Sequence, residues 1–225
     1  MELSDADADR GRDLESPAAA GSFRCRQILV DLLRPFGSNA RRSADRLIGA
    51  FGSLGGVLAA EPAAQARVLG AETAAVRHLC TIREAMLHAL RCDALAGPIL
   101  GDSQALLTYL TFDMAHLPTE RLRILYLNSA NRLLCDVTEP EGSVNATRVL
   151  PRAIMRRAVE VGATALILVH NHPSGDPTPS RDDVEATRRI ADAARALDIC
   201  IHDHVIVAGA AWTSFRALGL LRAAA

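Results

Sequence analysis

Two histidines spaced two residues apart, His170 and His172, are the residues of this chain best suited to chemistry. They follow an apolar run rich in β-formers, residues 164–169, which predicts a buried strand. Side chains on a strand alternate between its faces, so both imidazoles are expected to point the same way while Asn171 points elsewhere. Two imidazoles that project together from a strand end can converge on a zinc ion, at about 2.0–2.1 Å each.

A third ligand is expected from the helix that follows. Residues 172–179 are dense in turn formers, and Ser180 then begins a helix that carries Asp183 in its first turn. Two histidines and one aspartate leave one tetrahedral position open for water, which is typical of a catalytic zinc site. The same Ser180–Asp183 spacing also fits an acidic capping box, in which the two residues only stabilise the start of the helix.

The spacing of these four residues resembles the JAMM motif of the JAB/MPN metalloproteases. The wording HNHPSGDPTPSRDD at 170–183, followed by IHDHVIVAG at 201–209, is similar to the bacterial RadC family. The similarity extends back through 123–132 and, more weakly, 50–54, and so covers about residues 23–220. The literal string HNH does not indicate the HNH nucleases, whose three residues are spread along a ββα unit.

The resemblance implies a cytidine-deaminase-like α/β fold, a mixed sheet flanked by helices. It implies zinc held by His170, His172 and Asp183, with the Ser180 hydroxyl assisting the oxyanion. The implied chemistry is metal-assisted hydrolysis of an amide bond, in a peptide or protein substrate. The H-x-E and P-C-x-x-C signature of zinc deaminases is absent, which disfavours deamination.

A glutamate outside the ligand set activates the water in this family. Glu120 is our prediction for it, because it lies between an expected helix and the strand that follows; the alternative is a solvated residue at a strand start. Glu139 and Glu141, ahead of a further strand expected near Ser143, are rivals. The chain departs from the family at Ala153, where a glutamate is usual, and this removes a possible ion pair or substrate contact without touching the metal set.

Hydrophobic periodicity and turn-forming residues predict the helices and strands around these residues. His202 and His204 share the face of one expected strand by the period-two rule, as a second metal pair or as a polar strand end that orients a ligand or the substrate. We expect helices at 24–33, 44–51, 103–115, 152–161 and after Asp182, and strands at 122–127, 164–169 and 199–207.

Charge and pattern divide the chain into an acidic tail at 1–22, a small helical domain at 23–98 and the JAB/MPN domain at 99–225. The tail holds six acidic residues and two arginines, and the chain contains no lysine. Residues 23–92 hold ten arginines and five acidic residues, a net charge of +5 that mildly favours nucleic acid.

Residues 68–75 resemble the hairpin of a helix-hairpin-helix module, which holds phosphate through backbone N–H groups. Gly70 fits that motif, but Glu72 stands where a second glycine is expected, and a carboxylate repels phosphate. The alternative to a hydrolase is therefore a DNA-associated repair or recombination protein in which the metal domain is structural or recruiting.

The cysteine content and the lengths of the apolar runs constrain the cellular compartment of the protein. Five scattered cysteines without a C-x-x-C pair argue against a disulfide framework, and indicate a reducing, cytoplasmic compartment. No apolar run approaches the ~20 residues needed to span a bilayer, and the first twenty residues lack the features of a signal peptide.

Overall fold

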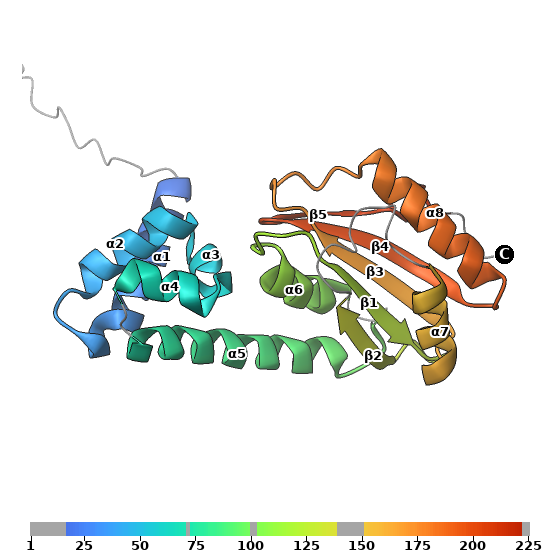
Figure 1. The fold of residues 1–225 in the computed structure, drawn as a ribbon, viewed down its shortest axis with the longest axis horizontal. Coiled ribbons are helices and arrows are strands. Elements are labelled where there is room, and N and C mark those ends of the chain that lie inside the picture. The colour runs from blue at the N-terminus through green and yellow to red at the C-terminus, as the bar shows by residue number, and fades with distance from the viewer. Residues whose placement is uncertain (1–16, 71–72, 100–102, 139–150, 222–225) are drawn as a thin grey trace, which may run out of the picture.

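The computed structural model describes residues 17–70, 73–99, 103–138 and 151–221 (Figure 1). Its first part is helical, and the apolar sides of these helices enclose a core that includes Leu29, Leu47 and Leu79. Within the described residues the helices of this part are α1 (Pro17–Leu33), the 3-10 turn η1 (Arg34–Phe36), α2 (Ala40–Phe51), α3 (Leu54–Ala59), α4 (Pro62–Leu69) and the long α5 (Thr73–Leu95).

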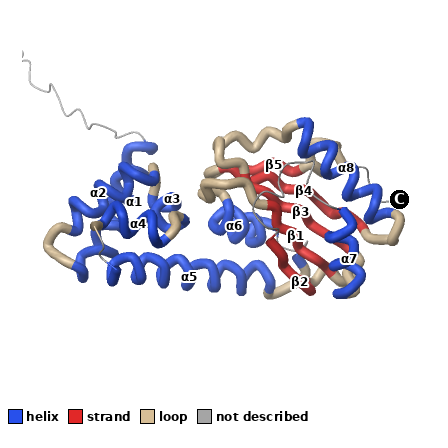
Figure 2. The backbone as a smooth tube through the Cα atoms, in the orientation of Figure 1, coloured by secondary structure: helices blue, strands red, loops and turns tan. Residues whose placement is uncertain are grey.

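The second part of the chain contains one mixed five-stranded sheet (Figure 2). Its strands lie in the order β2-β1-β3-β4-β5, with β3 and β4 parallel and every other neighbouring pair antiparallel. The strands are β1 (Leu122–Leu127), β2 (Leu133–Thr138), β3 (Ala165–Asn171), β4 (Cys200–Ala208) and β5 (Ala211–Ser214). The fold is therefore the α/β fold that the sequence predicts, preceded by a helical region.

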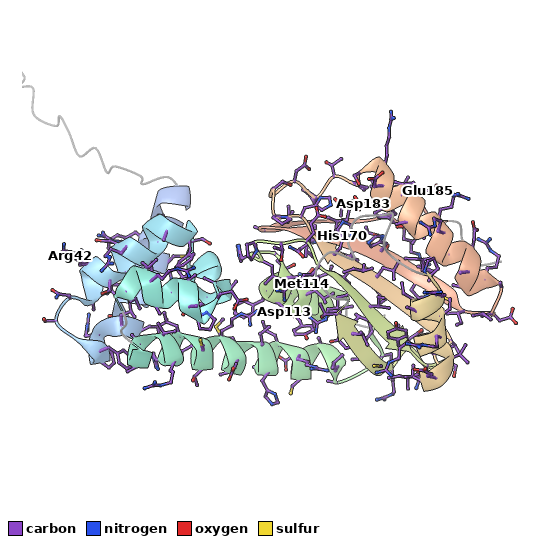
Figure 3. The ribbon with its side chains drawn as sticks, viewed as in Figure 1. Arg42, Asp113, Met114, His170, Asp183 and Glu185 are labelled. Atoms are coloured by element: carbon purple, nitrogen blue, oxygen red, sulfur yellow. The ribbon has the colours of Figure 1, made fainter. Side chains whose placement is uncertain are left out.

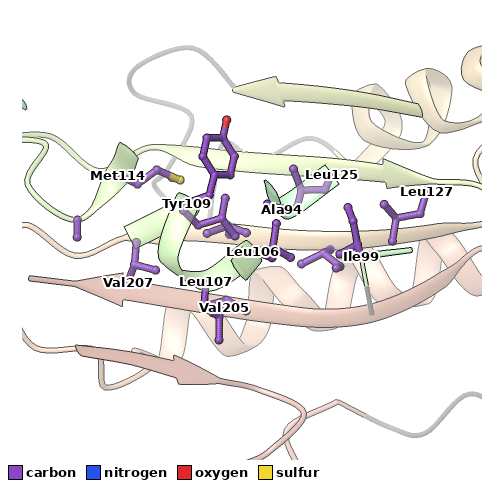
Figure 4. Close-up of a cluster of buried hydrophobic side chains, with 14 of the residues drawn as sticks. Ala94, Ile99, Leu106, Leu107, Tyr109, Met114, Leu125, Leu127, Val205 and Val207 are labelled. Atoms are coloured by element: carbon purple, nitrogen blue, oxygen red, sulfur yellow. The ribbon is translucent and has the colours of Figure 1, made fainter. Parts of the chain in front are cut away.

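Helices cover both faces of this sheet because its central strands are apolar on both sides. β1 and β3 are buried along their whole length, as near-continuous hydrophobic strands are. On one face, Leu125, Leu127 and Val169 pack with α6 (Ser103–Met114) and the end of α5 (Figure 4). On the other face, the alternate residues pack under α7 (Pro151–Val161) and α8 (Arg181–Arg195).

A buried arginine ties α6 to the sheet. The Arg123 side chain, 8% exposed, donates from Nε and Nη2 to the two carboxylate oxygens of Asp136 on β2, at 2.6 and 2.5 Å. Its other contacts are to Asp113 and Tyr109 on α6. A buried charge is tolerated where it is paired and hydrogen-bonded in this way. The α6–β1 connection, which carries Glu120, is thus anchored at both of its ends.

Most expected elements are present, with two corrections. The second strand of the sheet is β2, which the sequence did not predict; the strand expected near Ser143 lies outside the described residues, as do Glu139 and Glu141. The expected shared face of His202 and His204 is wrong. β4 has one extra residue where Leu166 pairs with Ile201 and Ile167 with Asp203, and this bulge reverses the alternation between the two histidines.

None of the helices in the part of the chain that the structure describes is long and apolar enough to cross a membrane.

Candidate metal centre

Three of the predicted ligands meet at one point, where the end of β3 faces the first turn of α8 (Figure 3). One nitrogen each of His170 and His172 and one carboxylate oxygen of Asp183 all lie within 4.8 Å of one another. The two Nε2 atoms are 2.8 Å apart, and Asp183 Oδ1 lies 3.3 Å from His170 Nε2. Asp183 Oδ2 lies 3.5 Å from His172 Nε2. The structure therefore brings together the three groups that the sequence pattern singles out.

Asp183 is held in place by the start of its own helix. Ser180 is the N-cap of α8: its backbone N–H donates to Asp183 Oδ2 at 2.8 Å, and its Oγ accepts from the Asp183 N–H at 3.1 Å. The Ser180 hydroxyl also donates to Asp183 Oδ2 at 2.5 Å. The capping box and the proposed site are thus the same residues, and the cap orients the carboxylate toward the histidines.

The hydrogen bond made by His172 Nδ1 determines which of the two ring nitrogens carries the proton in the neutral ring. His172 Nδ1 lies 2.8 Å from the carbonyl oxygen of Asp176 in the turn after β3. Because a carbonyl can only accept, Nδ1 carries the proton and donates. His172 Nε2 in the neutral ring is then unprotonated, with its lone pair directed toward the shared point.

The ring of His170 is oriented by a chain of hydrogen bonds that runs from Thr187 through His204. The Thr187 hydroxyl donates its single proton to the Asp183 carbonyl at 2.6 Å, so Thr187 Oγ1 accepts from His204 Nδ1, also at 2.6 Å. His204 Nε2 is then an acceptor, and it takes the proton of His170 Nδ1 at 2.8 Å. His170 Nε2 is therefore unprotonated as well.

The resulting donor set fits a divalent cation. Two imidazole nitrogens and a carboxylate oxygen meet at one point, and two ring nitrogens that face each other at 2.8 Å need a proton or another positive charge between them. Burial lowers the pKa of His170 to about 4, against the opposing effect of Asp183, and so favours the neutral ring that binds metal. Histidine nitrogen and aspartate oxygen are ligands that zinc uses at catalytic sites.

Replacing His204 with leucine is expected to weaken zinc binding by about 10- to 100-fold, because ligand-orienting hydrogen bonds contribute on that scale. His204 is buried, and among the described residues its ring nitrogens contact Thr187 and His170. Thr187→Val, which removes the hydroxyl at nearly constant volume, should weaken binding less. Competition against a zinc-binding dye measures both, and wild-type affinity in His204→Leu would rule out the orienting role.

Glu120 lies outside the ligand group, just before the start of β1. It is exposed and comes two residues before Leu122, which pairs with His170 across the β1–β3 ladder. Leu122, Ile124 and Tyr126 pack on the face of the sheet that α8 covers, which is the face of His170. The strand register therefore places Glu120 at the same edge of the sheet as the two histidines.

His202 belongs to a different environment from His204. Its Nε2 lies 2.7 Å from Asn131 Oδ1, and its Nδ1 lies 3.6 Å from the Sγ of Cys200. It has no contact with the metal centre among the described residues. Of the two histidines on β4, only His204 reaches the site, and the sequence contained no signal of the bulge that separates them.

Gly70 has a structural task in this chain. It ends α4 in the left-handed conformation, with φ +76° and its N–H donating to the carbonyl of Ala66. That N–H is the group that a helix-hairpin-helix motif would offer to phosphate. Glu72 lies outside the described residues.

A mixed sheet with helices on both faces and a His-His-Asp group at one strand end defines a JAB domain, a metallohydrolase-like fold. The RadC-like JAB domain family matches residues 100–220. The UPF0758 protein of Rhodobacter capsulatus is 46% identical over 178 residues, which are 79% of this chain and 83% of that relative. The chain belongs to the RadC family. JAB domains are associated with hydrolase activity and often bind zinc.

Proposed function

We propose that this protein is a zinc-dependent hydrolase that cleaves peptide or isopeptide bonds. The observation that carries the proposal is the convergence of His170 Nε2 and His172 Nε2, 2.8 Å apart, with the Asp183 carboxylate. Bound by these residues, zinc supplies a Lewis acid that polarises the scissile carbonyl and acidifies the attacking water.

The remaining steps belong to the protein's own side chains. Glu120 accepts the proton of the attacking water and returns it to the leaving amine, as a general base and then a general acid. The Ser180 hydroxyl donates a hydrogen bond to the oxyanion of the tetrahedral intermediate and keeps its proton. This hydroxyl turns away from Asp183 Oδ2 for that purpose, and the Ser180 N–H, at 2.8 Å, continues to hold the carboxylate.

Metal analysis and a cleavage screen on the full chain test this function. We expect about one zinc per chain by elemental analysis, since one His-His-Asp group is present among the described residues. Cleavage of a peptide library, and of a fluorogenic substrate with a lysine isopeptide bond, should stop on addition of chelator and return with zinc. A chain without zinc, or cleavage that the chelator leaves unchanged, would refute the proposal.

The DNA-associated alternative depends on the arginine-rich helices of residues 23–98. The backbone N–H of Gly70, the glycine that fits the hairpin motif, is already hydrogen-bonded to Ala66. The metal centre therefore supports hydrolysis more directly than the helices support nucleic-acid binding.

A further inference from the structure

Asn171, the residue between the two histidines, has a fully buried side chain that is hydrogen-bonded at both ends. Its Oδ1 accepts from the backbone N–H of Arg121 at 2.9 Å, and its Nδ2 donates to the backbone carbonyl of Thr119 at 3.0 Å. These are the two peptide groups on either side of Glu120. The side chain thus contacts the chain immediately before and immediately after the predicted base.

The position of Asn171 in the sheet explains this contact. The antiparallel pairing of β1 with β3 ends at the pair Leu122–His170, so the segment before Leu122 has no partner strand in register. One step further along β3, the carboxamide of Asn171 supplies one donor and one acceptor, which are the groups a peptide unit would have offered. The α6–β1 connection is therefore continued along β3 by a side chain where the backbone ladder ends.

We propose that Asn171 is a positioning residue for Glu120: it holds the backbone of 119–121 against the end of β3, so that the base stays at a fixed distance from the metal centre. This inference rests on the proposed function, in which Glu120 moves the proton. The tripeptide His170–Asn171–His172 then performs two tasks on opposite sides of one strand. The histidines bind the metal, and the asparagine places the base relative to it.

The chemistry of the contact selects asparagine. Aspartate has the same shape but presents an oxygen to the Thr119 carbonyl, so one hydrogen bond becomes a repulsion. Leucine fills a similar volume and makes neither bond. Gln65 offers a matched control, because its buried amide also donates to a backbone carbonyl, that of Val57 at 2.6 Å, but in the helical region.

The test compares Asn171→Leu, Asn171→Asp and Gln65→Leu in the full chain. For Asn171→Leu we expect unchanged zinc stoichiometry and hydrogen exchange of the Arg121 amide faster by about tenfold or more, since that amide loses its acceptor. We expect kcat to fall about 10- to 100-fold with little change in KM, the effect of a displaced catalytic group. In the Glu120→Gln background, Asn171→Leu should cause little further loss, because the two residues act as one unit.

Asn171→Asp keeps the acceptor for Arg121, so it should retain more protection of that amide than Asn171→Leu does while still losing turnover. Gln65→Leu should leave kcat and the exchange of Arg121 unchanged. Wild-type exchange at Arg121 in Asn171→Leu would overturn the proposal, as would full additivity with Glu120→Gln. A wild-type chain that cleaves nothing would refute the proposed hydrolase, whereas the exchange of Arg121 would still decide whether Asn171 holds the 119–121 segment.

Discussion

Replacing His172 with alanine is expected to abolish both zinc binding and hydrolysis. The residue contributes one of the two converging ring nitrogens, and its ring is held by the Asp176 carbonyl in the turn after β3. Two ligands remain in the variant, His170 and Asp183, which are too few for the three protein ligands of a catalytic zinc. Elemental analysis and kcat/KM on the fluorogenic substrate measure the two losses separately.

The thermal stability of the same variant gives a readout independent of activity. A ligand that binds only the folded chain stabilises it by about 2.7 kcal/mol at a free concentration 100 times its Kd. Zinc should therefore raise the Tm of the wild-type chain and leave the Tm of His172→Ala unchanged.

His202→Ala is the matched control for this experiment. It removes a histidine of β4 that contacts Asn131 and Cys200 and not the metal centre. We expect wild-type zinc content and turnover in that variant. Full zinc content in His172→Ala, or loss of zinc in His202→Ala, would show that the metal binds elsewhere.

The sequence-based prediction relies on local rules where a single strand or helix determines the direction of a side chain. The period-two alternation of β3 places His170 and His172 on one side, and the N-cap at Ser180 fixes where α8 begins and hence where Asp183 lies. Both features are written in contiguous residues. The end of β3 and the start of α8 then lie close together because the connection between them is short.

The parts that sequence could not predict depend on the pairing of distant segments. β2 was missed because its residues are half-buried or exposed and it lacks the long apolar run that marks β1 and β3. The role of His204 depends on a bulge, which arises from the register of β4 against β3. The role of Asn171 depends on how the segment before β1 lies against the end of β3, and a strand pattern contains no information about its partner's register.

Replacing Glu120 with glutamine is expected to leave zinc in place and to reduce turnover by about 100- to 10,000-fold, the usual contribution of a general base. Glutamine keeps the size and polarity of the side chain but cannot take a proton from the attacking water. Glu120 is not part of the His-His-Asp group, so its loss removes no ligand. The variant should therefore separate proton transfer from metal binding, which His172→Ala removes together.

Glu185→Gln on α8 controls for the loss of a carboxylate near the site. Its side chain is exposed and pairs with Arg188 at 2.6 Å, so we expect wild-type turnover and zinc content (Figure 3). If Glu120→Gln retained full turnover, the base would have to be another glutamate, and Glu139→Gln and Glu141→Gln would be the variants to compare next. In that case Asn171→Leu should also leave kcat unchanged, because the 119–121 segment that it holds would carry no base. Together, Glu120→Gln, Glu185→Gln and Asn171→Leu thus determine whether the proton is moved from the edge of the sheet next to His170.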